Sequence, residues 1–143
     1  MSAAACPFCG ISAREAPAAI VADDGLVLAF MDLRQAVPGH VLVAPHRHAA
    51  DLYALTSDEA AASMRMAQQV ARALRAEFDP PGLNLWQSSG RAAGQEVFHF
   101  HLHVQPRCAG DGLLRVYPGG VPTPAKAGEL EAMAQALRMR LRG

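Results

Sequence analysis

The chain has 143 residues, which is the length of a single domain. Its hydrophobic fraction of 51% is enough for a core, and 13 basic side chains balance 13 acidic ones, so the formal net charge is zero. A neutral chain lacks the electrostatic footprint of a protein that binds nucleic acid or a membrane surface. The sequence has no membrane-spanning apolar run and no secretory signal at its N-terminus, so we expect a cytoplasmic protein.

The chain has three cysteines, and two of them, Cys6 and Cys9, form a C-x-x-C pair near the N-terminus. In a reducing compartment this spacing indicates half of a metal site or a redox pair before it indicates a structural disulfide. A thioredoxin-like pair lies between a strand and a helix, and no strand precedes CPFC, so that interpretation is disfavoured. Cys108 has no partner in the pattern and is expected to be an ordinary thiol.

Three short strands are predicted in the first part of the chain. Residues 19–24 and 26–32 flank Asp24 and Gly25, a residue pair typical of a hairpin turn. Residues 40–46 follow a Pro-Gly pair and predict a third strand.

A long central helix is predicted to begin at Thr56, where the sequence TSDE forms a capping box with Glu59. The sequence Asp-Pro-Pro-Gly at residues 79–82 ends it. The apolar face predicted for this helix comprises Ala60, Met64, Ala67, Ala71, Leu74 and Phe78.

Two further strands are predicted at residues 83–88 and 96–106, and a C-terminal helix is predicted to open at Thr123-Pro124. About five strands that cluster before and after a helix favour an α+β fold with an antiparallel sheet over a doubly wound fold. The face predicted for the C-terminal helix comprises Leu130, Met133, Leu137 and Leu141.

Three histidines alternate with apolar residues in the last predicted strand. Because side chains alternate between the two faces of a strand, His99, His101 and His103 are expected to share one face. They could be polar residues on a solvated face, although three at perfect alternation are unusual there. They could instead bind one metal ion, or they could divide the roles of nucleophile, hydrogen-bond donor and structural ligand. The opposite, core-facing set is predicted to be Phe98, Phe100, Leu102 and Val104.

A loop rich in Gly, Ser and Ala, SSGRAAGQ at residues 88–95, leads directly into this strand. Such a loop lets backbone N–H groups approach an anion closely. A glycine-containing loop is weak evidence by itself, but before three histidines it indicates a phosphate held against a nucleophilic imidazole.

The motif G-Q-x-V-F-H-F-H-L-H-V at residues 94–104 resembles the signature of the histidine triad (HIT) family of nucleotide hydrolases and transferases. CPFCGI, VLAFMDL and PGHVLVAPHRH also resemble family segments in the expected order. The resemblance implies one HIT domain over residues 1–143, with a zinc-anchored N-terminal segment at 1–15 and a C-terminal tail and helix at 108–143. Family members usually pair as homodimers through the central helix and a strand, so we expect a sheet that is extended across a dimer.

The same resemblance implies catalytic roles. His101 would attack the α-phosphate of a nucleotide conjugate and form a nucleotidyl-histidine intermediate, which water then hydrolyses. His103 would donate to the phosphate or the leaving group. The backbone amides of Gly94–Glu96 and the side chain of Gln95 would stabilise the phosphate oxygens as charge builds on them.

Further positions match nucleotide-binding residues of the family. Asp32 would accept hydrogen bonds from the ribose hydroxyls, and Ser88 stands where family members commonly carry Asn or Gln against the phosphate. Glu96 departs from the best-known eukaryotic branch, which has Ser or Thr there, and this puts the leaving-group preference in doubt. The residues implied to enclose the base, for which core packing is nearly as good an interpretation, are Phe8, Ile11, Phe30 and Leu33.

The resemblance also implies a structural zinc site, because some bacterial-type members bind zinc through the N-terminal cysteine pair and two histidines. Both His46 and His48 are available after the third strand, and position favours His48. The implied tetrahedral ligand set is Cys6, Cys9, His48 and His99.

Three functions remain open from the sequence. The first is a hydrolase that releases a nucleoside 5′-phosphate, with adenine nucleotides expected, from a dinucleoside polyphosphate or a phosphoramidate. The QPR ending after the triad resembles the hydrolases that act on dinucleoside polyphosphates more than the phosphoramidase branch. Arg107 in it could help to bind extra phosphates, or it could be a surface residue. The second is a nucleotide sensor or interaction module with little activity. The third is a zinc hydrolase whose ligands are the triad histidines themselves.

Overall fold

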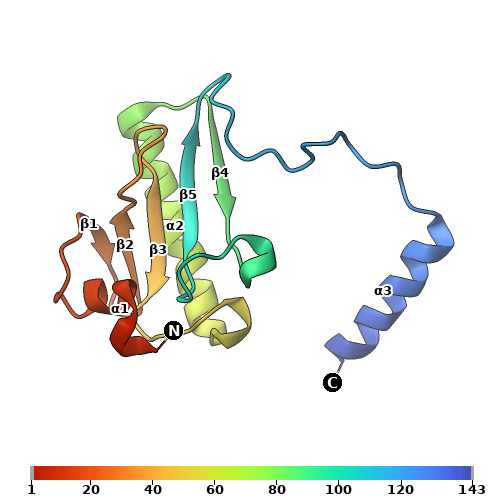
Figure 1. Cartoon of the computed structure of the whole chain (residues 1–143), viewed down its shortest axis with the longest axis horizontal. Coiled ribbons are helices and arrows are strands. Elements are labelled where there is room, and N and C mark those ends of the chain that lie inside the picture. Colours follow the sequence, from red (N-terminus) through yellow and green to blue (C-terminus); the bar gives the residue numbers. More distant parts are fainter. Residues whose placement is uncertain (1, 143) are drawn as a thin grey trace. The chain divides into compact units, whose positions relative to one another are not determined.

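The computed structural model describes residues 2–142, and the chain falls into two compact units, residues 1–111 and 112–143. The first unit contains one sheet in the order β1-β2-β3-β5-β4, in which all neighbouring strands are antiparallel (Figure 1). The predicted α+β fold with an antiparallel sheet is confirmed, whereas the single-domain organisation stays a prediction. The strands are β1 (Ile20–Asp23), β2 (Val27–Met31), β3 (Val41–Pro45), β4 (Gly82–Trp86) and β5 (Leu102–Arg107).

The helix α2 (Ser57–Phe78) covers one face of this sheet. Its predicted capping box is present, because the Thr56 side chain accepts from the Glu59 N–H and the Glu59 carboxylate accepts from the Thr56 N–H. Asp79 then turns into the left-handed region (φ 42°) and ends the helix.

The buried stripe of α2 differs from the predicted apolar face. Met64 and Phe78 are 54% and 50% exposed, whereas the polar Glu59 and Ser63 are buried. Alanines and methionines occur all round this helix, so spacing alone does not define its inner face. The buried polar groups are satisfied, because Arg47 pairs with Glu59 and the Ser63 hydroxyl donates to a helix carbonyl. The buried apolar residues of α2 are Ala62, Met66, Ala67, Val70 and Leu74.

Gly39 lets the chain pass close beneath the end of α2 before it enters β3. Its φ of 102° is in the region that favours glycine, and a Cβ there would lie 2.7 Å from a Leu74 methyl and 3.0 Å from Pro106. This close approach of the backbone to α2 places the next residue, His40, in a buried position directly before β3.

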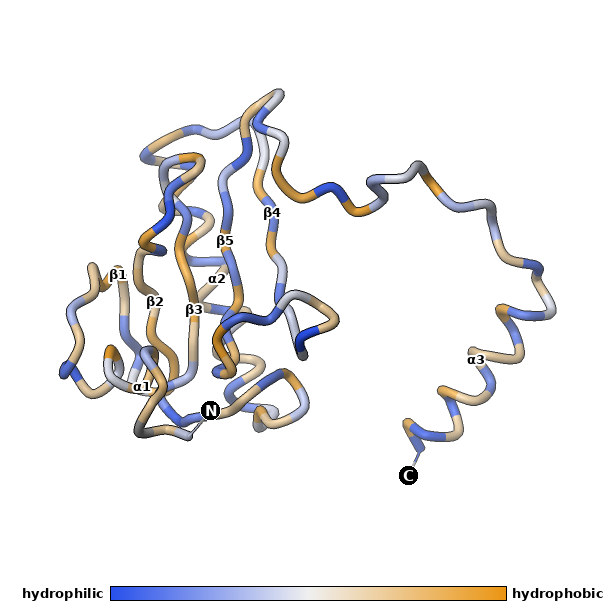
Figure 2. Tube along the Cα trace, viewed as in Figure 1, coloured by the Kyte–Doolittle hydropathy of each residue, from blue (hydrophilic) through white to orange (hydrophobic). Residues whose placement is uncertain are grey.

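The other sheet face is covered by the N-terminal helix α1 (Pro7–Ser12). Its side chains Phe8 and Ile11 pack on a second apolar cluster made by Leu28, Phe30 and other residues of β2 and β3. The hydrophobic character of β3 is visible in Figure 2. The short helices η1 (Ala3–Ala5), η2 (Leu52–Ala54) and η3 (Arg91–Ala93) lie in the connecting segments.

The last strand is shorter than predicted, because regular pairing begins at Leu102 and not at residue 96. The segment ahead of it is held by other contacts, including a 2.6 Å bond from the Phe100 N–H to the Ala49 carbonyl. Phe98 is also not a core residue, since it is half-buried with the Arg91 guanidinium 5.3 Å above its ring. The other predicted core residues, Phe100, Leu102 and Val104, do pack in the main cluster.

The second unit contains α3 (Ala127–Leu141), which begins three residues after the predicted Thr123-Pro124 start. Lys126 is its N-cap residue, and the Lys126 N–H donates to the Glu129 carboxylate. Hydrophobic and hydrophilic residues alternate along this helix in Figure 2, and Leu130 and Leu137 are exposed. Across residues 2–142, no helix is long and apolar enough to cross a membrane.

The ion pair between the buried Glu59 and the exposed Arg47 gives a test of the packing of α2. The hydrogen bonds from Arg47 are the main cause that lowers the pKa of Glu59 to about 2. A carboxylate with a lowered folded-state pKa contributes stability above its ordinary pKa and loses that contribution as the pH falls toward 2. We expect Glu59→Gln to lower the free energy of unfolding at neutral pH by about 2 kcal/mol, measured by urea denaturation, with a smaller loss at about pH 3.5.

The matched control is Asp58→Asn, which changes an exposed carboxylate in the same first turn and is expected to cost less than about 0.5 kcal/mol. A Glu59→Gln protein as stable as the unmodified chain at neutral pH would show that the buried pair contributes nothing.

Candidate functional site

A cavity of about 510 Å³ lies on the face of the sheet that carries α1. Its size suits a small-molecule ligand such as a nucleotide. Eight of the predicted site residues line it: Phe8, Ile11, Phe30, Asp32, Leu33, Glu96, His101 and His103. The structure thus brings together residues from three separated segments of the sequence, 8–11, 30–33 and 96–103.

One part of the cavity wall is apolar and aromatic. The rings of Phe8 and Phe30 meet edge to face with centroids 5.3 Å apart, and Ile11 and Leu42 extend this wall. Leu33 is 96% exposed at the rim, so it contributes less enclosure than the other predicted base contacts.

His101 is held in one tautomer. Its Nδ1 lies 2.8 Å from the carbonyl oxygen of His99, and a carbonyl only accepts, so Nδ1 carries the proton. The Nε2 lone pair is then unprotonated in the neutral ring. Burial lowers the pKa of His101, which keeps the imidazole neutral near pH 7. A neutral imidazole with an available Nε2 can act as a nucleophile.

His103 is linked to a histidine that the sequence reasoning gave no role. The Nδ1 of His103 lies 2.9 Å from Nε2 of His40, and the indole of Trp86 stacks on its ring. Burial, with smaller contributions from His101 and His40, lowers the pKa of His103 to about 3. His40 was missed because its contact with His103 depends on the pairing of β3 with β5; the only local signal is its place after a Pro-Gly turn.

The carboxylate of Asp32 lies next to Nδ1 of His40, the ring nitrogen that does not contact His103. One carboxylate oxygen accepts from the Arg34 N–H at 2.7 Å, and the other lies 3.7 Å from Nδ1 of His40. That Nδ1 also lies 3.4 Å from the Arg34 carbonyl, so both neighbours are acceptors and favour a proton on Nδ1 of His40. Burial lowers the pKa of His40, and Asp32 opposes this shift.

The loop of residues 88–95 forms hydrogen bonds within itself and with the segment after β3, and it does not line the cavity. The Gln95 side chain accepts from the Gly90 N–H and donates to the carbonyls of Ala50 and Val97. The backbone N–H groups of Gly94 and Gln95 donate to carbonyls of the same loop. Of the predicted phosphate contacts, Ser88, Gly94 and Gln95 are therefore not brought to the cavity wall in this conformation.

Glu96 lies at the rim with its side chain 84% exposed. Its carboxylate is 3.9 Å from the Arg34 guanidinium, which is also exposed, so it turns outward toward a cation. Arg107 does not line the cavity either, because its guanidinium is bonded to Asp111 and to Asn84.

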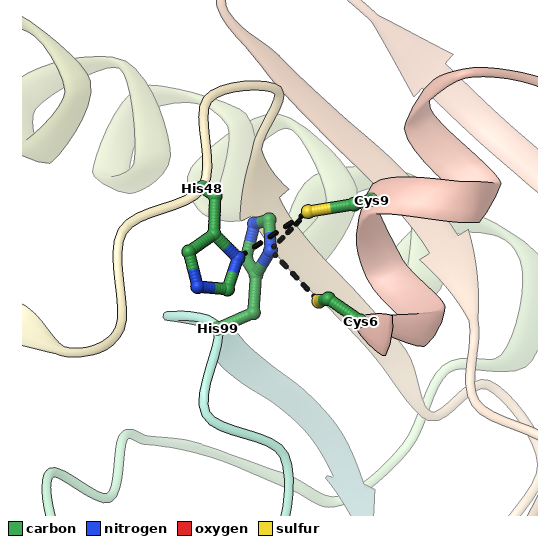
Figure 3. A group of neighbouring side chains, drawn as sticks. All are labelled: Cys6, Cys9, His48 and His99. Carbon is green, nitrogen blue, oxygen red and sulfur yellow. Dashed lines mark hydrogen bonds between the residues drawn. The ribbon is translucent and has the colours of Figure 1, made fainter. Parts of the chain in front are cut away.

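A second cluster of side chains lies beside His101. Cys6, Cys9, His48 and His99 converge from three segments, and their ligand atoms all lie within 4.8 Å of one another (Figure 3). The Nδ1 of His99 is 3.3 Å and 3.5 Å from the two sulfurs, and Nδ1 of His48 is 3.3 Å from Cys9. Ligands of a tetrahedral zinc, at about 2.3 Å for sulfur and 2.0 Å for nitrogen, are separated by about 3.5 Å.

The surroundings of this cluster also suit a metal ion. The Nε2 of His99 donates to the Pro45 carbonyl at 2.8 Å, which leaves the Nδ1 lone pair facing the sulfurs. Burial, followed by the neighbouring Cys6, raises the pKa of Cys9 to about 11, so without a cation this thiol stays protonated. A bound dication would reverse that preference. Two thiolates and two imidazoles form a donor set that zinc prefers.

The three triad histidines are not arranged as one ligand set. His99 faces the cysteines, His101 bonds a backbone carbonyl, and His103 bonds His40. Residues 2–142 contain two groups of possible metal ligands, the cluster above and the group of Asp32, His40 and His103, and each includes one triad histidine.

His46, the alternative zinc ligand, is engaged elsewhere. Its Nδ1 lies 2.5 Å from the Ser12 hydroxyl and its Nε2 lies 2.8 Å from an Asp23 oxygen. The geometry resembles a hydrolytic triad, but the N–H groups of Ala13 and Arg14 donate to carbonyls of α1 and cannot form an oxyanion hole. The contacts join the end of α1 to β1 and to the end of β3.

Comparisons with known protein sequences identify the family. The sequence model of the HIT domain matches residues 13–110. The Bacillus subtilis protein named Protein hit is 43% identical over 113 residues, 78% of each chain. An adenosine 5′-monophosphoramidase of Schizosaccharomyces pombe is 30% identical over 137 residues, 96% of this chain and 98% of that protein.

Solved structures of the same family share the fold. A HIT family protein from Bacillus anthracis has a TM-score of 0.87 at 35% identity, covering 97% of this chain and 99% of its own. A zinc-bound histidine triad family protein from Mycobacterium smegmatis has a TM-score of 0.72 at 32% identity, covering 99% and 98%. The chain therefore belongs to the histidine triad family.

Proposed function

We propose that the chain is a nucleotide hydrolase or transferase that cleaves at the α-phosphate of a nucleoside 5′-phosphate conjugate, with His101 as nucleophile. The observation that carries this proposal is the bond from Nδ1 of His101 to the His99 carbonyl, which leaves Nε2 unprotonated beside the cavity. In the first step, Nε2 forms a bond to phosphorus while the bond from phosphorus to the leaving oxygen or nitrogen breaks. In the second step, water attacks phosphorus, the P–N bond to His101 breaks, and the nucleoside monophosphate is released.

The leaving group needs a proton, and the pair His40–His103 is placed to supply it. With the proton of neutral His40 on Nδ1, the His103 Nδ1–H donates to His40, and Nε2 of His103 is unprotonated. Burial lowers the pKa of both rings, and the charge of Asp32 and of a bound phosphate opposes that shift. One additional proton on the pair then makes Nε2–H of His103 a donor to the leaving group. The attacking water returns that proton to the pair in the second step.

The nucleotide is proposed to lie with its base against the apolar wall of Phe8, Ile11 and Phe30, and with its ribose near Asp32. Adenine is the proposed base, because the S. pombe relative is named an adenosine 5′-monophosphoramidase. An adenylate phosphoramidate is favoured over a dinucleoside polyphosphate, because Arg107 is bonded to Asp111 and does not supply a contact for extra phosphates.

A second candidate function is a nucleotide-binding module with little activity. The observation that favours it is the phosphate loop, whose Gly94 and Gln95 amides are already bonded within the loop and do not form a ready anion site. Binding of AMP without turnover of any adenylate conjugate would select this alternative.

We expect His101→Ala to lower the turnover of adenosine 5′-phosphoramidate at least about a thousandfold, because the variant lacks the proposed nucleophile. Binding of AMP should remain within about tenfold of the unmodified chain, since the apolar wall and Asp32 are unchanged. The measurements are steady-state kinetics and calorimetric titration. A variant that retains full turnover would contradict the assignment of the nucleophile.

We also propose that Cys6, Cys9, His48 and His99 hold a structural zinc ion that anchors the N-terminal segment beside the active site. The proposal is supported by the donor set, the ligand spacing and the zinc-bound relative from M. smegmatis. Four protein ligands close the coordination shell, so the ion would have no open position for substrate.

The purified chain is expected to contain about one zinc per protein by elemental analysis, and Cys6→Ser should lose it together with several degrees of thermal stability. Cys108→Ser is the matched control, because this exposed cysteine lies outside the cluster. A metal-free chain, or zinc retained in Cys6→Ser, would contradict the proposed site.

Pairing of two copies is proposed through α2 and β4. The strand β4 forms one edge of the sheet, and Leu83 and Leu85 on it are exposed, as are Met64 and Phe78 on α2. Open edges and apolar surface patches are features that interfaces cover.

The expected cytoplasmic location stays a prediction.

Light scattering should therefore give about twice the chain mass, and Leu85→Lys should shift the protein toward the monomer because it places a charge in the apolar contact. Leu130→Lys on α3 is the control. A monomeric unmodified chain at micromolar concentration would contradict the proposed pairing.

A further inference from the structure

Trp86, the last residue of β4, lies flat against His103. The two ring centroids are 4.0 Å apart and the ring planes differ by 6°. The two residues are directly opposite each other in the register of β4 and β5, so their backbones hold the rings together. His40 also lies near the indole, with centroids 5.4 Å apart.

The stack restricts a motion that the other contacts of His103 allow. A single hydrogen bond from Nδ1 to His40 leaves the imidazole free to tilt about that bond. The indole, parallel to one face, opposes tilting and keeps water off that face. On the other side of β5, His103 is paired with Leu42 of β3, which has no hydrogen-bonding side chain.

Trp86 has no clear role in forming the core. It is half-buried, and neither cluster of buried apolar residues includes it. It also does not line the cavity, so it is not placed to touch a bound nucleotide directly. Its close ring contacts are with His103 and His40, the two residues proposed to move the leaving-group proton.

We infer that Trp86 is a positioning residue, whose indole fixes the plane of His103 so that Nε2 stays aimed at the leaving group. The inference rests on the proposed function for its catalytic consequence, whereas the stack itself can be tested without turnover. A tilt of the imidazole would move Nε2 away from the leaving atom and slow proton transfer, while the nucleotide would still bind.

The kinetic test compares Trp86→Leu, Trp86→Phe and the control Val21→Ala, which changes an exposed apolar residue of β1 at the opposite edge of the sheet, away from the cavity and from the proposed dimer contact. We expect kcat of Trp86→Leu on adenosine 5′-phosphoramidate to fall about tenfold, with KM within about twofold of the unmodified chain. Trp86→Phe keeps an aromatic face and should recover most of kcat. An unchanged kcat in Trp86→Leu, or a similar loss in Val21→Ala, would overturn the inference.

The second test is proton NMR of the histidine rings, which needs no activity. Protons above an indole face are shifted upfield by its ring current, so the His103 ring protons should be upfield in the unmodified chain. They should return to the ordinary range in Trp86→Leu, with assignment from His103→Gln. Trp86 is the one tryptophan of the chain, so no other indole can produce the shift.

The two tests separate the failure of this inference from that of the proposed function. Unshifted His103 protons would overturn the stack whether or not the protein is an enzyme. An unmodified chain that shows the upfield shift without turnover would overturn the catalytic role of Trp86 together with the proposed function.

Discussion

His99 is the residue on which the rest of the site depends. Its ring faces the two cysteines through Nδ1 and donates to the Pro45 carbonyl through Nε2, and its own carbonyl accepts the proton of His101. It is fully buried, so each of these polar contacts must be satisfied inside the protein. One residue therefore connects the N-terminal segment, the end of β3 and the proposed nucleophile.

The segment after β3 extends these contacts to the loop of residues 88–95. The ring of His48 faces Cys9. The carbonyl of the next residue, Ala49, accepts from the Phe100 N–H, and the carbonyl of Ala50 accepts from the side chain of Gln95. Three consecutive residues after β3, residues 48–50, therefore contact the Cys/His cluster, the segment of the triad and the loop of residues 88–95. Tying α1 into this arrangement matters for binding as well, because α1 supplies Phe8 to the apolar wall of the cavity.

Local patterns in the sequence predicted the features that depend on neighbouring residues. The Thr56 capping box, the hairpin at Asp24 and the positions of the first four strands along the chain are of this kind. Contacts across the sheet were not predictable, because the register that places Trp86 opposite His103, and β3 beside β5, follows from tertiary packing. The start of β5 at Leu102 was missed for the same reason, since distant contacts hold the preceding residues and period-two alternation does not reveal them.

The central claim is that Nε2 of His101 forms a covalent bond to the α-phosphorus of a nucleotide. The most direct measurement is intact-protein mass spectrometry after rapid mixing with adenosine 5′-phosphoramidate and an acid-free quench, followed by mapping of the modified peptide. The account predicts a transient mass increase of one adenylyl group on His101, absent in His101→Ala. Turnover without any adduct, or an adduct on another residue that persists in His101→Ala, would contradict it.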